Sequence, residues 1–172
     1  MAAEAAARRS QPAFDIRREA LPFLACAACF LLAAVAAAVT RAAVSFAHGW
    51  WLVAYLLLVG CIAQALLGIG APLRAGRTGG RAPSAALVRW QLGLWNAGTL
   101  AVAVADLGGA PAGVLAGSAS LLAALWLFAR GFARAGGRGP TRGWLALYPL
   151  LVAFMAGSAI VGCYLAEALP GQ

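Results

Sequence analysis

Five long apolar stretches, separated by short polar or glycine-rich segments, make up most of the chain. A helix needs about 20 consecutive apolar residues to cross the hydrocarbon core of a bilayer. The pattern therefore predicts an all-α integral membrane protein, a bundle of five transmembrane helices within residues 20–172, after a tail at 1–19. The expected helices lie at about 21–40, 50–70, 86–107, 112–133 and 144–169.

The segments between the stretches contain residues that usually end helices. The connection at 71–84 includes Pro72, Gly79 and Pro83, and glycine and proline are strong turn formers. Trp50 opens the second stretch, and tryptophan rings gather where the membrane meets water. We therefore expect a loop at 71–84 and a membrane surface near Trp50.

The first stretch follows a basic segment, and this order resembles a secretory signal peptide. The apolar region of a signal peptide is about 7–15 residues long, which is shorter than the stretch at 21–40, and four further stretches follow it. We interpret the first stretch as an uncleaved membrane helix and residues 1–19 as a cytoplasmic tail.

Composition supports the bilayer as the solvent of this chain. The sequence is 63% hydrophobic and 10% charged, with a mean hydropathy of +0.85, whereas soluble domains carry about 25% charged residues. The net charge of +8 comes from arginine without lysine. A basic soluble domain would suggest nucleic acid, but these arginines lie between the apolar stretches, so no nucleic-acid partner is expected. Arginine without lysine, beside abundant alanine and glycine, favours a bacterial origin and hence the plasma (inner) membrane.

The arginines also predict an orientation. Four precede the first stretch, one (Arg41) follows it, four lie in or near the second connection, none in the third, four in the fourth, and none after the last stretch. Loops rich in arginine stay in the cytoplasm. This positive-inside pattern predicts a multi-pass protein with its N-terminus in the cytoplasm and its C-terminus outside.

Ionisable residues lie near the outer ends of the predicted helices. Arg41, His48, Asp106 and Glu167 are all expected at the outer face. His48 is the only histidine, and one hypothesis makes it a haem ligand or a copper ligand. The alternative is an interfacial histidine that faces water. One histidine does not complete a ligand set, which favours the interfacial interpretation, and haem stays an open possibility. No catalytic residue or metal site is predicted.

Cys26 and Cys29 form a C-x-x-C motif, which can indicate redox chemistry, metal binding or covalent haem. Both cysteines lie within a predicted membrane helix, and Phe30 stands where covalent haem attachment needs histidine. Together with Cys61 and Cys163, they are interpreted as small apolar packing residues.

Uncharged polar residues in the second and third stretches form a separate group of candidates. Their amides and hydroxyls need partners in a bilayer, and they commonly hydrogen-bond between helices. We expect them to join helices, and the alternative is that they line a substrate or quinone pocket. The residues are Gln64, Gln91, Asn96 and Thr99.

Small residues recur at four-residue spacing in two stretches, and in the second stretch Gly60 and Gly68 flank Gln64 at the same spacing. Such rows let helix backbones approach closely. They are expected to pack helices within the chain or against a partner. The glycines are Gly60, Gly68, Gly109, Gly113, Gly117, Gly157 and Gly162.

Three hypotheses for the function follow. The first is a non-catalytic or accessory subunit of a larger membrane complex, with other membrane proteins as partners. A second is a haem- or quinone-associated electron-transfer subunit, based on His48. The third is a small transporter for a neutral or apolar solute, based on the membrane amides and on a weak inverted likeness between residues 49–59 and 143–152.

Overall fold

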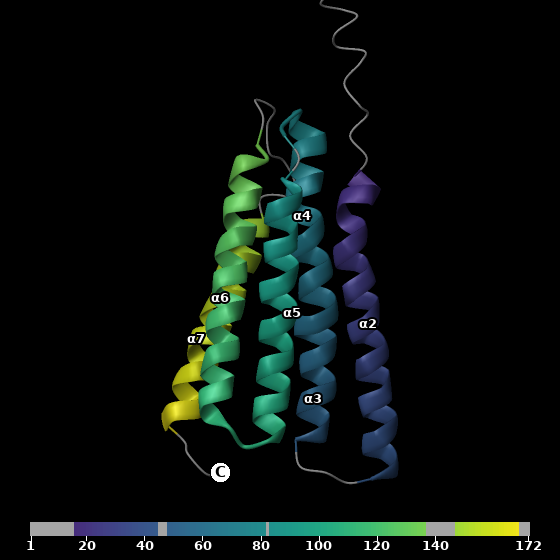
Figure 1. Cartoon of the computed structure of the whole chain (residues 1–172), viewed down its shortest axis with the longest axis vertical. Coiled ribbons are helices and arrows are strands. Elements are labelled where there is room, and N and C mark those ends of the chain that lie inside the picture. Colours follow the sequence, from purple (N-terminus) through teal and green to yellow (C-terminus); the bar gives the residue numbers. More distant parts are fainter. Residues whose placement is uncertain (1–15, 45–47, 82, 137–146, 169–172) are drawn as a thin grey trace, which may run out of the picture.

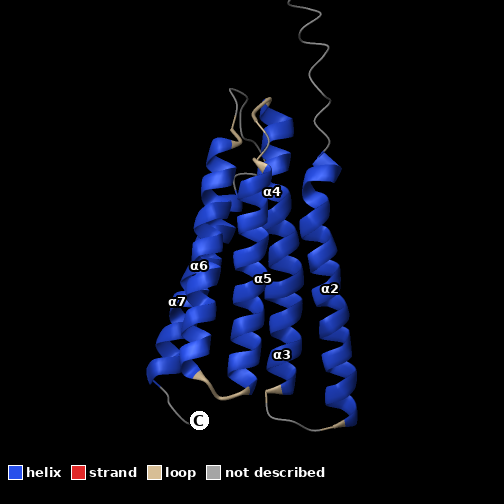
Figure 2. Ribbon diagram, viewed as in Figure 1, coloured by secondary structure: helices blue, strands red, loops and turns tan. Residues whose placement is uncertain are grey.

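The computed structural model describes residues 16–44, 48–81, 83–136 and 147–168, but not the side chains of 16–18, 158–159 and 161–168. Every regular element in the described ranges is a helix (Figure 2). Consecutive rods run up and down beside one another in one bundle (Figure 1). The all-α prediction is therefore confirmed. The elements are α2 (Ile16–Ala43), α3 (Gly49–Tyr55), the π-helical η1 (Leu56–Ala63), α4 (Gln64–Thr78), α5 (Ala85–Leu107), α6 (Pro111–Arg134) and α7 (Tyr148–Ala168).

Three of the rods are long and apolar enough to cross a membrane, judged by length and composition: Glu19–Ala43, Gly49–Thr78 and Pro111–Arg134. Helix α5 carries Gln91 and Asn96 and is not among these three. In α7 the stretch with described side chains before the first gap, Tyr148–Gly157, is a shorter apolar helical segment, while the helix itself continues to Ala168. These spans support a transmembrane protein, while the full set of five spans and their orientation stay predictions.

Elements α3, η1 and α4 follow one another without a break, so the second rod extends well beyond the expected end at residue 70. It passes Pro72 and ends at Thr78, because Gly79 takes a left-handed conformation with φ 65° and caps the helix. The extra turns bury Ala71 and Ala75 against Ala135 at the end of α6. The loop expected at 71–84 is therefore mostly helix, since this packing outweighs the turn preference of Pro72.

Helix α2 also starts earlier than expected, at Ile16, and so takes in part of the predicted tail. Its inner face places Phe23 against Gly68 and Phe30 against Gly60 of the second rod. A side chain at either glycine would overlap a phenylalanine ring. The two glycines therefore act as recesses that let α2 lie close to the rod.

The tightest pair is α5 and α6, which are joined by a short turn that Gly109 permits through its φ of 62°. A Cβ atom at Gly98 would lie 2.8 Å from the carbonyl oxygen of Gly117. The helix backbones therefore nearly touch at this level. Trp95 and Phe128, both almost fully buried, meet edge to face nearby with ring centroids 5.9 Å apart, so the centre of the core lies between these two helices and the second rod.

Candidate functional site

The ends of α4 and α6 lie together, and they bring several arginines to one end of the bundle, here called the arginine end (Figure 1). Its members on these two helices are Arg74, Arg77, Arg130 and Arg134. Three of them are exposed, and the guanidinium carbon of Arg130 lies 4.9 Å from the centroid of the Trp126 ring. Arg74 is the only one of the four that is partly buried, so it differs from the others in having fixed neighbours inside the bundle.

The Arg74 guanidinium is held between α4 and α6. Its Nη1 donates a hydrogen bond of 3.0 Å to the carbonyl oxygen of Phe132, one of the last carbonyls of α6, which lack partners within their own helix. The guanidinium carbon also lies 4.5 Å from the centroid of the Phe132 ring. Its Nε is buried and has no hydrogen-bond partner. The Nε donor of the group therefore remains unused.

Tyr148, the first residue of α7, holds that helix against α4 and α6 beside Phe132. Its ring stacks on Phe132 with centroids 4.2 Å apart and an interplanar angle of 13°. Its hydroxyl donates a hydrogen bond of 2.9 Å to the carbonyl of Leu67. Gly70 leaves space for the ring on α4, where any side chain would overlap it. The Phe132–Tyr148 pair thus acts as a spacer between α6 and α7.

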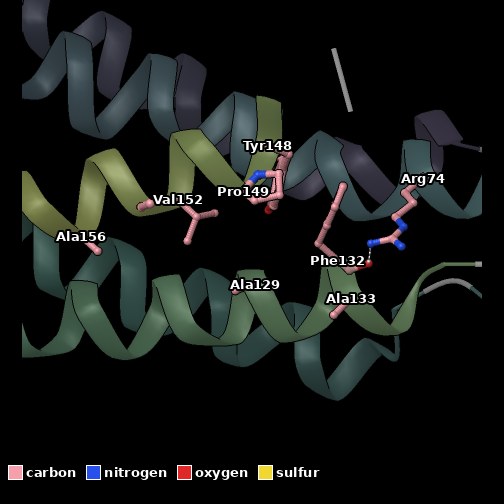
Figure 3. A pocket seen from close by; sticks show the side chains of 9 residues that line it. Arg74, Ala129, Phe132, Ala133, Tyr148, Pro149, Val152 and Ala156 are labelled. Atoms are coloured by element: carbon pink, nitrogen blue, oxygen red, sulfur yellow. Dashed lines mark hydrogen bonds between the residues drawn. The ribbon is translucent and has the colours of Figure 1, made fainter. Parts of the chain in front are cut away.

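Below this spacer, α6 and α7 leave a pocket of about 380 Å³. Arg74 and Phe132 lie at one end and Val152 and Ala156 toward the other (Figure 3). Apart from the guanidinium, the lining is almost entirely apolar. The residues that line it are Arg74, Ala129, Phe132, Ala133, Tyr148, Pro149, Val152, Ala153 and Ala156.

The chemistry of this pocket is that of binding. It offers one cation at one end, a phenol whose proton is already donated to a backbone carbonyl, and an apolar channel. Among the described residues that line it, no nucleophile is paired with a base. The arrangement suits an amphipathic molecule that has a hydrogen-bond acceptor at one end.

The opposite end of the bundle holds the residues that the sequence predicts at the outer face. His48 Nδ1 lies 2.9 Å from Asp106 Oδ2, which links the start of α3 to the end of α5. Arg41 lies against Gly49, and its guanidinium carbon is 6.0 Å from the Trp50 ring. Two of the four expected neighbours are therefore in direct contact, while the side chain of Glu167 lies outside the described residues.

His48 is the one non-glycine residue with positive φ in the described ranges, at 62°. Its role as a haem ligand stays a prediction. The bond from Nδ1 to Asp106 would leave Nε2 for a ligand, an arrangement common for ligating histidines. Within the described parts of the chain, no group of three or more His, Cys, Asp or Glu residues could hold a metal ion. Cys26, Cys29 and Cys61 are free cysteines.

The four polar candidates have different surroundings. Gln91 Nε2 donates to the carbonyl of Leu127 at 3.0 Å, a bond from α5 to α6. Asn96 Nδ2 instead donates a hydrogen bond of 2.8 Å to the carbonyl oxygen of Leu92 on its own helix.

Gln64 and Thr99 have no side-chain hydrogen bond although both are fully buried. The hydroxyls of Thr99 and Tyr55 approach each other, yet neither completes a hydrogen bond. The interior therefore contains polar atoms that the described residues do not satisfy.

The predicted small-residue rows also differ. Gly60 and Gly68 receive the rings of α2, and Gly113 and Gly117 lie against Ala105 and Val102 of α5. A Cβ at Gly109 or Gly157 would meet nothing within 4 Å. Gly109 serves its turn instead, and Gly157 lies on an open helix face. The contacts of Gly162 fall outside the described residues.

Arg74, Phe132 and Tyr148 are not among the site residues that the sequence predicts, and Arg74 falls in the expected loop. The spacing Gly70-x3-Arg74-x3-Thr78 is the signal that could have found it, because residues four apart share one face of a helix. No protein-family model, curated protein or solved structure matches the chain.

Proposed function

We propose that the chain is a non-catalytic accessory subunit of a larger membrane complex in the bacterial plasma (inner) membrane. It spans the membrane five times, with the arginine end in the cytoplasm. Arg74, Arg77, Arg130 and Arg134 gather at one end of the bundle, which supports this orientation, since arginine-rich ends stay in the cytoplasm.

The observation that carries the proposal is the open position at Gly157 of α7. Four other glycines of the predicted small-residue rows are used within the chain: Gly60 and Gly68 lie against α2, and Gly113 and Gly117 lie against α5. A Cβ atom at Gly157 would meet no neighbour within 4 Å, and the residue lies on a face with the exposed Leu150 and Ile160. A small residue between larger apolar ones forms a recess on the lipid-facing side of α7.

A transmembrane helix of a partner protein is the occupant that fits this recess. Lipid tails are as apolar as leucine, so helices in a bilayer associate through close packing at small residues. The recess offers such packing without any rearrangement of the chain. A partner helix is therefore expected to cross α7 at Gly157.

The test compares Gly157→Leu with Gly93→Leu. Gly93 also has nothing within 4 Å of its Cβ position, but it lies on α5, so it is a matched control. Each tagged variant is purified in mild detergent from its native membrane, and the proteins that accompany it are identified. We expect Gly157→Leu to lose a membrane partner that the unmodified chain and Gly93→Leu retain. Recovery of the unmodified chain only as a free monomer would contradict the proposal.

The orientation has its own test. A cysteine placed at Arg77 in a cysteine-free background should react with a membrane-impermeant reagent only from the cytoplasmic side. A cysteine placed at His48 should react only from the opposite side, because the two residues lie at opposite ends of the bundle. The reverse labelling would overturn the proposed orientation.

A second candidate function is a transporter for a neutral solute. It is favoured by the buried amide of Gln64, both of whose polar atoms lack a partner, and by the unpaired hydroxyl of Thr99. Buried polar atoms without partners are costly, and a solute or water would satisfy them. In proteoliposomes, this function requires solute flux that Gln64→Leu abolishes, while Gln91→Leu, whose amide already bonds α6, retains it.

A further inference from the structure

We propose that the pocket at the arginine end binds an anionic membrane phospholipid, with its phosphate at Arg74 and one acyl chain between α6 and α7. This site is independent of the partner helix proposed above. Gly157 does not line the pocket, although Ala153, four residues earlier on the same face of α7, lies at its rim.

The shape of the pocket matches the orientation of a lipid. Its cationic end is Arg74, at the arginine end of the bundle, and from there it runs along the groove toward Ala156 and the middle of the bundle (Figure 3). A phospholipid has the same order, because its phosphate lies at the membrane surface and its chains point toward the centre of the bilayer. A chain can enter sideways, since Ala133 and Ala153 at the rim are exposed.

The lining is suited to hydrocarbon. Ala129 and Ala133 on α6 face Val152 and Ala156 on α7 across the space (Figure 3). Their small side chains leave a channel of about 380 Å³, which lies within the usual range for ligand pockets. A polar solute would find no hydrogen-bond partner among the described residues along this channel, whereas an acyl chain needs none.

The cationic end is suited to a phosphate. Arg74 Nη1 donates a hydrogen bond to the Phe132 carbonyl, and the guanidinium lies over the Phe132 ring, which in turn stacks on Tyr148. Its buried Nε still lacks an acceptor, and a guanidinium offers several donors in a geometry that matches phosphate oxygens. The exposed guanidiniums of Arg77 and Arg134 at the same end add positive potential. Basic pockets between membrane helices on the cytoplasmic side are typical sites for anionic headgroups.

The test measures lipid binding by the purified full chain in a neutral detergent. Dioleoyl phosphatidylglycerol, dioleoyl phosphatidylcholine and inorganic phosphate are added separately. Native mass spectrometry counts bound lipid, and thermal unfolding reports stabilisation. We expect one tightly retained phosphatidylglycerol and a rise of about 5 °C in the melting temperature at saturating lipid. Phosphatidylcholine and inorganic phosphate should give neither effect.

Two variants locate the site. Ala129→Phe fills the channel, and Ala123→Phe on the exposed side of the same helix is its control. Arg74→Gln removes the cation, with the exposed Arg77→Gln as its control. We expect Ala129→Phe and Arg74→Gln to weaken phosphatidylglycerol binding about tenfold or more, and the two controls to bind as the unmodified chain does.

Each contrary outcome overturns a definite part of the proposal. Equal stabilisation by inorganic phosphate would identify a soluble anion as the ligand. Equal retention of phosphatidylcholine would remove the role of the charge. A folded Ala129→Phe variant that keeps its phosphatidylglycerol would place the lipid elsewhere. Ala129→Phe leaves Arg74 in place, so the binding measurement on Ala129→Phe remains informative even if Arg74→Gln does not fold.

Discussion

Helix α6 packs on two neighbours in two different ways. Toward α5 its glycines meet glycine and small apolar residues, so that the Gly98 and Gly117 backbones nearly touch. Toward α7 it meets an aromatic ring instead, because Phe132 stacks on Tyr148 at the arginine end. The first contact closes the interface, whereas below the second the helices remain apart and leave a pocket.

The comparison shows how the size of facing residues sets the distance between helices. Two glycines at the same level bring backbones together, while two stacked rings hold them apart. Alanines beside the rings, such as Ala129 and Ala156, are too small to fill the resulting space. A closed pair and an open pair can therefore share one helix, and the substitutions below test whether facing residue size is the cause.

The largest expected effect is at the closed interface. In Gly98→Leu the new Cβ would lie 2.8 Å from the Gly117 carbonyl and 2.9 Å from Leu121 Cγ, so α5 and α6 must separate. We expect the free energy of unfolding to fall by about 3 kcal/mol, as for overpacked cores. Titration of the protein from mild detergent into a denaturing one, followed by circular dichroism, measures this value. An unchanged stability would contradict the close backbone contact.

The next effect is at the spacer. Tyr148→Leu loses the stack on Phe132 and the hydrogen bond to Leu67, and we expect a loss of about 2 kcal/mol from these two contributions. Tyr148→Phe keeps the ring and should lose only about 1 kcal/mol. The same titration compares the two variants. Equal losses in both would show that the stack contributes nothing to the position of α7.

The helices themselves were the predictable part of this molecule. Long apolar runs are a strong signal, and the turn at Gly108 and Gly109 interrupts them visibly, so α5 ends at its expected residue and α6 begins within one residue of its expected start. The end of α4 was harder to predict from the sequence, because Pro72 on its own suggests a loop. The contact of Ala75 with Ala135 favours helix there, and Ala135 lies far away in the sequence.

The candidate site was not predictable in the same way. The pocket exists because two rings from distant segments stack and separate α6 from α7, and no local pattern encodes this separation. The partners of polar residues posed a similar problem. Gln91 and Asn96 lie on the same helix, yet one bonds α6 and the other bonds its own backbone. The rotation of the helix decides between these outcomes, and it depends on packing around the whole bundle.

A smaller effect tests the polar bond across the closed interface. Gln91→Leu removes the hydrogen bond from Nε2 to the Leu127 carbonyl, and we expect a loss of about 0.6 kcal/mol, the average for such bonds in membrane proteins. Asn96→Leu is the control, because its amide nitrogen bonds Leu92 of the same helix and its Oδ1 is buried without a partner. We expect no loss there. A larger loss for Asn96→Leu than for Gln91→Leu would contradict this assignment.

The smallest effect on the isolated chain is expected at Gly157, where the comparison becomes sharpest. Gly98→Leu and Gly157→Leu make the same chemical change in two membrane helices, but a Cβ at Gly157 meets no atom within 4 Å. Leucine also favours a helix by about 0.8 kcal/mol over glycine. We therefore expect the stability of purified Gly157→Leu to be unchanged or slightly raised in the same detergent titration. A loss comparable to that of Gly98→Leu would mean that α7 packs through Gly157 within this chain. In that case the recess would not be available to a partner helix.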